Sequence, residues 1–520
     1  MRKGGVDMAG IGFELRKLFD EDDSFSGYIK ALTFSTFISV GPFIAMILSI
    51  NILILVSKLV FNNPSEQLLF ITTLVYSFIF SQLISFPFQF FVTRYISDRF
   101  YEKEYKKVRP SFIGVSKIII TLSLILGVIF FGMKELPLYY KYLSIGILVI
   151  LSLLWTITTY ISILKDYVYI SKIYFYSTIL SVIVFFITTK YPIMFFEHRV
   201  AGNMLVSFFI GILFSLHMLT NYFFSIFKEG EGGEYEFLGY LKNYSSLLFT
   251  GLFYILGTWS HIIINWFSPW AVNIGYGFKI TLHYENAVFY SFLLTIPSIV
   301  FFVVFIETRF FDIYQKYYAL TLKNGTLDEI EKERKKMRRK LYKEIFYALQ
   351  IQIFITITAI LFSRYFIIYY GMSTELVEIF KIVSLGAIAN IYIIILISIF
   401  FYFNALKSAL KVTGLFCLLN TLFTLGFINL GKKYIGFGFF LGSVISVLYA
   451  LQLFDKIIDG LNYTTFYSQN YALKHRGRSL SKIIRKMNHG ITLKWQARYL
   501  KIGFLVSVFL LIIFSYQILK

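Results

Sequence analysis

Residues 31–60 read ALTFSTFISVGPFIAMILSINILILVSKLV, and the stretch carries a single charged side chain, Lys58. A helix needs about 20 predominantly apolar residues to cross the hydrocarbon of a bilayer. This run exceeds that length. It is also longer than the roughly 7–15 residues of the apolar region in a cleavable signal peptide. The stretch therefore predicts a transmembrane helix that the mature chain keeps.

The composition of the whole chain has the same bias. Of its 520 residues, 57% are hydrophobic and 15% are charged, and the mean hydropathy is +0.69. Soluble domains are about 45–50% apolar and about 25% charged, whereas disordered chains are polar and highly charged. The composition excludes both classes and indicates an integral membrane protein.

Thirteen segments have the length and apolar character of membrane spans. They are residues 30–59, 68–93, 113–132, 142–164, 167–189, 201–227, 245–265, 286–306, 345–369, 376–403, 410–430, 435–455 and 502–519. The sequence thus predicts an all-α polytopic membrane protein with about twelve core transmembrane helices and a thirteenth span, short but uninterrupted, at the C-terminus.

Lysine and arginine are distributed unevenly among the loops. Residues 94–117, 309–343 and 456–501 are rich in them, whereas the opposite loops carry one or two each. Because cytoplasmic loops carry the excess of basic residues, we expect the N-terminus in the cytoplasm and the chain in the cell membrane. The basic clusters behind the net charge of +21 lie beside the spans, where binding to anionic lipids explains them. We therefore expect no nucleic-acid partner.

Short motifs recur in order along the chain, which indicates an internal duplication. Gly27-Tyr28-Ile29-Lys30 recurs as Gly239-Tyr240-Leu241-Lys242, Tyr76-Ser77-Phe78 as Tyr290-Ser291-Phe292, and Thr93-Arg94 as Thr308-Arg309, at offsets of 212, 214 and 215 positions. Six spans per half give both halves the same orientation, which is the parallel-repeat arrangement.

These patterns divide the chain into six parts. They are a cytoplasmic amphipathic N-terminus (1–27), a first six-helix half (28–227), a polar cytoplasmic linker (228–244), a second six-helix half (245–457) with a basic cytoplasmic loop (309–343), a cytoplasmic basic segment (458–501) and an extra span (502–519).

The sequence lacks familiar catalytic and metal-binding patterns. Cys417 is the single cysteine, and the six histidines are scattered. There is no phosphate-binding Gly-x4-Gly-Lys-Ser/Thr loop, no His-Glu-x-x-His and no Gly-x-Ser-x-Gly. We therefore expect neither an enzyme nor a cofactor or metal site. Energy for transport would come from a gradient, from the polymerising substrate or from a partner.

Polar side chains at membrane depth are costly and commonly face an interior cavity. In span 245–265, His261 and Asn265 share a helical face at i,i+4, and Trp259 lies nearby. The group is either a sugar-binding platform at the outer mouth or an interfacial aromatic belt. Arg364, near the outer end of span 345–369, either lines a pathway or snorkels to the interface. His217 in span 201–227 is a packing residue or a pathway residue.

Prolines fall inside three spans. Gly41-Pro42, Pro87 and Pro297 interrupt spans 30–59, 68–93 and 286–306. A proline frees backbone groups, which is tolerated where neighbouring helices or a cavity satisfy them. These positions are either moving gates of a two-half transporter or plain kinks.

The loop before span 345–369 is expected to form a helix, whose basic run leads straight into that span. Thr326 and Glu329 form a capping box, and Glu331 is in register with Lys335 at i,i+4. The cations that follow either touch anionic headgroups or dock a cytosolic partner. They are Arg334, Lys335, Lys336, Arg338, Arg339 and Lys340.

The stretch MAGIGFELRKL at residues 8–18 resembles the opening of the PelG family of exopolysaccharide transporters. Similar segments follow along residues 8–470. They are residues 93–99 (with Arg94 and Asp98), 164–167 (with Asp166), 257–269 and 296–314 (with Glu307 and Arg309). One departure is that Ser260-His261 stand where the family often has an Asp-Lys pair, which removes an ion-pair role at this position.

The resemblance implies a fold like that of multidrug/oligosaccharidyl-lipid/polysaccharide exporters. It implies export of an N-acetylhexosamine-rich, partly deacetylated polymer for biofilm matrix. A cytosolic glycosyltransferase and a cyclic-di-GMP-responsive membrane protein are the implied partners. Two alternatives remain: a lipid-linked oligosaccharide flippase or cation-coupled drug exporter of the same fold, and a non-conducting scaffold of a polysaccharide synthase. A coupled exporter usually needs a carboxylate at membrane depth, and Asp166, Glu285 and Glu307 all lie at span ends.

Overall fold

The computed structural model describes residues 25–466, apart from 165, 192–196, 306–309, 323–324, 370 and 372. The first half contains α2 (Phe25–Val60), α3 (Pro64–Tyr101), η1 (Tyr105–Lys107), α4 (Val108–Gly132), α5 (Leu138–Ser162), α6 (Tyr167–Lys190) and α7 (Arg199–Ile226). The remainder contains η2 (Glu236–Tyr240), α8 (Leu241–Asn265), β1 (Val272–Gly275), β2 (Phe278–Ile280), α9 (Leu282–Leu293), α10 (Ile296–Phe305), α11 (Phe311–Leu322), α12 (Leu327–Tyr369), α13 (Thr374–Tyr402), α14 (Leu406–Leu430), η4 (Lys432–Tyr434), α15 (Phe437–Asp459) and α16 (Leu461–Phe466).

The described residues hold twelve helices that are long and apolar enough to cross a membrane. They coincide with the first twelve predicted spans, so the all-α polytopic fold is confirmed. The predicted thirteenth span, 502–519, lies outside the described residues. The helix expected in the loop before the ninth span is confirmed, and α12 runs unbroken from Leu327 into that span. Charged helix formers such as Glu331 and Arg334 favour helix as strongly as the apolar residues that follow.

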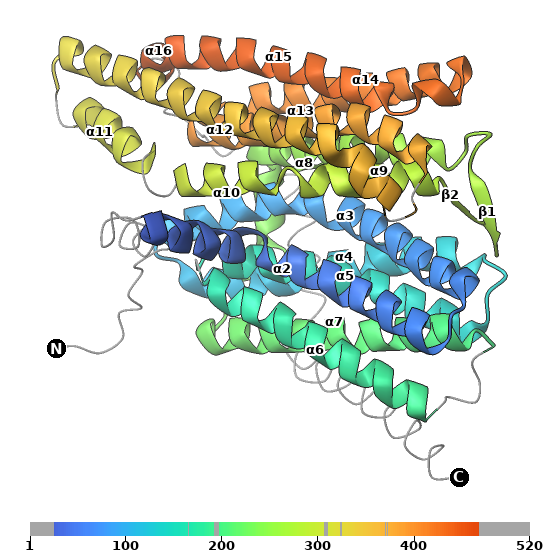
Figure 1. Cartoon of the computed structure of the whole chain (residues 1–520). Helices are drawn as coiled ribbons and strands as arrows, with labels where there is room; N and C mark the ends of the chain where they lie inside the picture. The colour runs from blue at the N-terminus through green and yellow to red at the C-terminus, as the bar shows by residue number, and fades with distance from the viewer. Residues whose placement is uncertain are drawn as a thin grey trace.

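The two halves form two layers (Figure 1). Equivalent pairs of spans pack together in both halves. The contacts α6–α7, α2–α6 and α5–α7 of the first half correspond to the contacts α14–α15, α8–α14 and α13–α15 of the second half. The layers meet where α3 packs on α8 and α2 on α10, which pairs the second span with the seventh and the first with the eighth. Two parallel repeats related by a pseudo-two-fold axis produce this pattern.

Two of the three prolines expected to interrupt a span do not end the helix. The helices α2 and α3 continue through Pro42 and Pro87. Beside Pro42, Ser171 of α6 donates to the Phe37 carbonyl at 2.9 Å and Thr178 donates to the Ala45 carbonyl at 2.9 Å. Hydroxyls of a neighbouring helix therefore stabilise the backbone around this proline.

The eighth span is divided in two. The helix α9 ends at Leu293, and α10 begins at Ile296 with Pro297 as its second residue. Gln352 of α12 donates to the Leu294 carbonyl at 2.8 Å and accepts from the Ser298 hydroxyl at 2.7 Å. A buried amide from another helix thus satisfies the backbone at the break.

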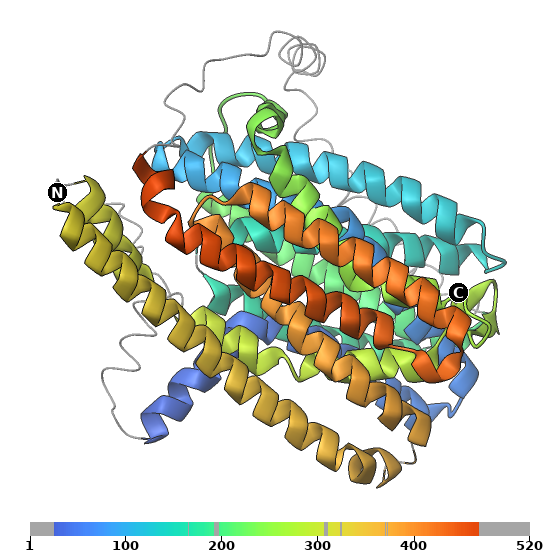
Figure 2. The same cartoon turned by 90° about the horizontal axis from the view of Figure 1, so that it is seen from above.

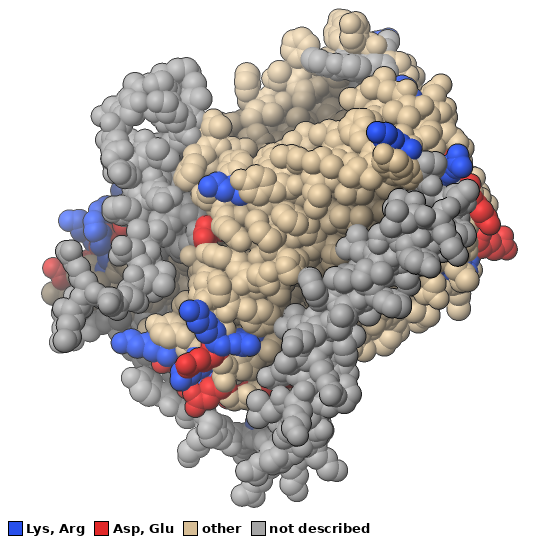
Figure 3. Space-filling model, turned by 90° about the horizontal axis from the view of Figure 1, so that it is seen from below, with Lys and Arg blue, Asp and Glu red and all other residues tan. Residues whose placement is uncertain are grey.

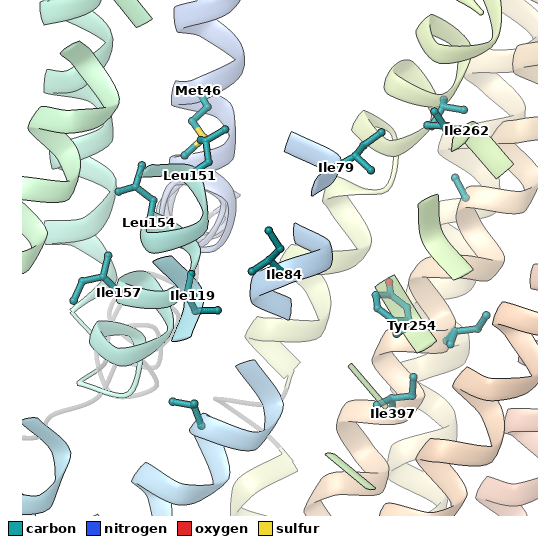
Figure 4. Close-up of a cluster of buried hydrophobic side chains, with 14 of the residues drawn as sticks. Met46, Ile79, Ile84, Ile119, Leu151, Leu154, Ile157, Tyr254, Ile262 and Ile397 are labelled. Atoms are coloured by element: carbon teal, nitrogen blue, oxygen red, sulfur yellow. The ribbon is translucent and has the colours of Figure 1, made fainter. Parts of the chain in front are cut away.

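Charged side chains gather near the edges of the face in Figure 3, and most of its described surface between them is uncharged. Apolar side chains are buried on both sides of the contact between the halves (Figure 4), including Leu151 of α5, Ile84 of α3 and Tyr254 of α8. The apolar exterior indicates lipid contact, and the apolar interior holds each half together.

Candidate functional site

The helices α3 and α8 run antiparallel and touch along their length; we call this contact the α3–α8 seam. Trp259 Nε1 donates to Gln82 Oε1 at 2.9 Å. At the middle of the seam, a Cβ on Gly251 would lie 2.8 Å from the Phe86 carbonyl oxygen and 3.0 Å from Pro87 Cα. Glycine is therefore required here for the two backbones to approach so closely.

A β-hairpin closes one end of the seam. The strands β1 and β2 pair antiparallel, with an irregularity between Asn273 and Gly275, and the turn uses positive φ at Gly275, Tyr276 and Gly277. This hairpin joins α8 to α9 but reaches across to the other half: Tyr76 of α3 donates to the Lys279 carbonyl at 2.8 Å.

A lysine of the first half secures the same hairpin. Lys134 Nζ donates to the Gly277 carbonyl and lies 4.5 Å from the Phe130 ring centre and 4.9 Å from that of Phe278. Burial lowers the pKa of Lys134 from its ordinary value. The sequence did not predict this hairpin, although glycines on both sides of Tyr276 were an available signal for a tight turn.

An aromatic and acidic cluster lies next to the hairpin. Trp266 stacks on Tyr76 with ring centres 3.9 Å apart, and its Nε1 donates to Glu285 Oε1 at 2.9 Å. The Thr281 backbone N–H donates to the same oxygen at 3.0 Å. Glu285 is buried, and its Oε2 has no hydrogen-bond partner in the described part of the chain. The sequence places this carboxylate at a span end, but no local pattern indicates its burial or its contact with Trp266.

The three predicted residues of α8 do not share one surface. Trp259 is half-buried and faces α3. His261 is fully buried and faces α9, where its Nδ1 and the Tyr284 hydroxyl are hydrogen-bonded at 2.7 Å. Asn265 donates to the His261 carbonyl at 2.7 Å and accepts from Trp270 Nε1 at 3.4 Å. Only Trp259 of this group contacts the opposite half through a hydrogen bond of the described residues.

Two other predicted pathway residues lie away from the seam. His217 is exposed on α7, where its Nε2 is 2.9 Å from Asn221 Nδ2. Arg364 is exposed on α12, a helix that packs on α10, α11 and α13. The structure does not bring either residue to the hairpin or to α8.

The family-like residues lie near the opposite end of the helices. Arg94 pairs with Asp98 at 3.2 Å and lies 5.3 Å from the Tyr244 ring centre of α8. Asp166 caps α6 by accepting from the Tyr169 N–H at 3.1 Å and from the Tyr222 hydroxyl. Glu307 and Arg309 lie outside the described residues. These contacts are structural: a helix cap and an inter-helix brace.

The predicted capping box is confirmed. The Thr326 N–H donates to Glu329 Oε2 at 2.9 Å, and the Glu329 N–H donates to Thr326 Oγ1 at 3.3 Å. The expected pair Glu331–Lys335 is present at 3.7 Å.

The basic run of α12 divides into two groups. Arg334 donates to the carbonyls of Ile458 at 3.0 Å and Asp459 at 2.6 Å, which satisfies the C-terminal end of α15. Arg338 pairs with Asp455 at 3.5 Å and with Asp459. The rest of the run points outward or pairs within α12: Lys335, Lys336 and Arg339 are exposed, and Lys340 lies 3.8 Å from Glu344.

Comparison with known proteins identifies the fold and a family. A family model named PelG, described as "Putative exopolysaccharide Exporter (EPS-E)", matches residues 8–466. An outward-facing multidrug resistance MATE family transporter of the MOP superfamily has a TM-score of 0.54 at 12% identity, over 86% of this chain and 98% of that one. A MOP superfamily transporter from Pyrococcus furiosus has a TM-score of 0.52 at 13% identity, over 86% and 98%. No curated protein sequence matches.

Proposed function

Because the chain belongs to the PelG family of exopolysaccharide exporters, we propose that it exports an N-acetylhexosamine-rich, partly deacetylated polysaccharide for biofilm matrix. It does so in the cell membrane, with its N-terminus in the cytoplasm. The family match over residues 8–466 carries the proposal, and the transporter fold supports it.

The polymer passes between the two halves along the α3–α8 seam. Aromatic rings such as Trp259 and Tyr76 offer flat apolar faces to sugar rings, and Gln82 offers hydrogen bonds to hydroxyl and amide groups. In the closed arrangement these groups are occupied with each other, at 2.9 Å for Trp259 and Gln82. A substrate that parts the halves takes over those contacts, so the seam opens without leaving polar groups unpaired.

Opening requires the β-hairpin to leave Tyr76 and Lys134. The spans that contain Gly41-Pro42, Pro87 and Pro297 take part in the contacts α3–α8 and α2–α10, so these prolines belong to the spans at which one half moves against the other. Rocking of one half against the other is the general mode of such two-repeat transporters. His261, Asn265, Arg364 and His217 do not face the seam, so the proposed route uses only Trp259 of the predicted pathway residues.

A cytosolic glycosyltransferase supplies the polymer, and a cyclic-di-GMP-responsive membrane protein completes the assembly. The exposed cations Lys335 and Lys336 are available for docking, whereas Arg334 and Arg338 are engaged with α15.

The test measures hexosamine polymer outside and inside cells that lack this chain and cells that carry it again, with the synthase shown to be present. Polymer retained inside the deficient cells supports export by this chain. Unchanged secretion refutes it. Loss of both pools favours the scaffold role, because synthesis itself then depends on the chain.

A second candidate is a cation-coupled exporter or lipid-linked oligosaccharide flippase. The buried carboxylate of Glu285 favours it, because a carboxylate held among aromatic rings is a natural site for a coupling cation. Substrate transport by the purified chain in vesicles, driven by an imposed proton or sodium gradient and lost in Glu285→Gln, would identify this function.

A further inference from the structure

A continuous exposed stripe runs along α12. Lys343, Phe346, Phe354, Leu361 and Arg364 recur at helical spacing on one face. The three apolar members are strongly exposed, at 60% for Phe346, 71% for Phe354 and 67% for Leu361. Since this helix is long and apolar enough to cross the membrane, we infer that its exposed apolar face contacts lipid.

The distance between the two cations at the ends of the stripe matches the thickness of the hydrocarbon core of a bilayer. Lys343 and Arg364 are 21 residues apart, which at about 1.5 Å per residue gives about 31 Å. The hydrocarbon core of a bilayer is about 30 Å thick. The exposed stripe therefore begins and ends at the two boundaries of the hydrocarbon.

A helix of the first half has a similar spacing between two exposed cations. On α6, exposed Lys172 and Lys190 are 18 residues apart, or about 27 Å. Between them lie the exposed apolar side chains Tyr176, Ile179 and Ile183, at 56%, 57% and 49%. Two helices from different halves thus carry exposed apolar faces of similar length between two cations.

The position of Lys343 at the edge of the hydrocarbon fixes how far the other cations of α12 lie from the membrane. Arg339 stands about 6 Å beyond Lys343 along the axis, Lys336 about 10 Å and Lys332 about 16 Å. The headgroup layer occupies roughly 5–8 Å on each side of the hydrocarbon. Figure 2 shows that this part of α12, with α11 beside it, projects past the end of the bundle. Lys343 and Arg339 therefore lie in the headgroup layer, and Lys332 lies beyond it.

Arg339 and Lys343 are also free to bind. Both are exposed, and no ion pair joins either of them to an acidic side chain within the described residues. Their neighbours differ: Arg334 and Arg338 are engaged with α15, and Lys336 lies 3.6 Å from Glu333. The exposed ring of Phe346 lies just below them, at the depth where aromatic side chains meet headgroups.

We propose that Arg339 and Lys343 form a binding site for the phosphate of an anionic phospholipid. The guanidinium of Arg339 binds two phosphate oxygens and the ammonium of Lys343 binds as a point charge. Arg364 snorkels to the headgroups of the opposite surface and does not line a transport pathway. The site fixes the depth of α12 and the height at which Lys332 and Lys336 stand in the cytosol. It does not depend on what the protein exports.

The experiment uses the full chain in nanodiscs that contain phosphatidylcholine with increasing phosphatidylglycerol, and counts retained phosphatidylglycerol by native mass spectrometry after release. The double variant R339Q/K343Q is compared with K332Q/K336Q, which removes the same charge from the same face farther out. Thermal unfolding confirms that both variants fold.

We expect R339Q/K343Q to weaken phosphatidylglycerol retention roughly 25-fold, at about five-fold for each cation, and K332Q/K336Q to leave it unchanged. Equal loss in both variants would show that this part of α12 lies flat on the membrane and would overturn the depth assignment. No loss in either variant would overturn the lipid site and leave the whole exposed cationic face to a protein partner.

Discussion

The close approach at Gly251 offers a direct test of the seam. Replacing Gly251 by alanine places a methyl group 2.8 Å from the Phe86 carbonyl oxygen and 3.0 Å from Pro87 Cα. Both neighbours are backbone atoms, so no side chain can turn away. The helices must separate by roughly half an ångström to restore ordinary contact, and overpacking of this kind costs about 1–3 kcal/mol. Because the cost falls only on the closed seam, the fraction of open molecules should rise about 5- to 150-fold.

The assay is the rate at which a maleimide labels a cysteine placed at Gln82, in a chain whose own Cys417 is replaced by serine. Gly426→Ala is the matched control, because nothing lies within 4 Å of a Cβ at that helical glycine, while the gain in helix propensity of up to about 1 kcal/mol is the same. We expect faster labelling with Gly251→Ala only. If both variants label like the parent, the seam is not closed by this contact and the reasoning fails.

Three further predictions follow from single contacts. Arg334→Ala should lower the free energy of unfolding by about 1.5–3 kcal/mol, because it removes the hydrogen bonds from a charged guanidinium to the Ile458 and Asp459 carbonyls. Exposed Arg339→Ala should change it by less than about 0.5 kcal/mol. Thermal melts compare the two variants, and equal effects would contradict the cap. Gln352→Ala should lower the free energy of unfolding by about 1–3 kcal/mol, because it leaves the Leu294 carbonyl without this hydrogen bond. Exposed Gln350→Ala should leave the free energy of unfolding unchanged. A thermal melt of Gln352→Ala like that of the parent would mean that Gln352 does not stabilise the break in the eighth span. Because burial lowers the pKa of Lys134, closing the hairpin releases a proton from this ammonium. Rising pH should therefore favour closure in the range between the lowered pKa of Lys134 and the ordinary lysine pKa of about 10.4. The measurement is the labelling of a cysteine at Tyr276, which should slow with rising pH relative to the same cysteine in Lys134→Gln.

The fold was predictable because its main signal is local. A run of about 20 apolar residues determines a span whatever surrounds it, and so the first twelve predicted spans match the structure. The capping box at Thr326 and Glu329 was predictable for the same reason, since its two hydrogen bonds join residues three apart.

The candidate site was predicted less well because its contacts are distant in sequence. Helical geometry places Trp259 and His261 on different faces of α8, but it does not say which face meets α3. Pro87 was recognised as a helix breaker, whereas Gly251, its contact, lies on another span and carries no signal of its own. The sequence leaves Arg364 equally compatible with a pathway and with the interface, because it does not say which face of α12 is exposed.

The sequence by itself determined that this is a membrane protein with duplicated halves, because hydrophobic length and motif order are properties of one dimension. Tertiary structure decided which cations hold α12 to α15 and which remain free, that Glu285 is buried beside Trp266, and that a hairpin of one half closes on the other. Each of these depends on atoms brought together from remote positions, where burial and hydrogen-bond geometry, rather than residue type, set the role of a side chain.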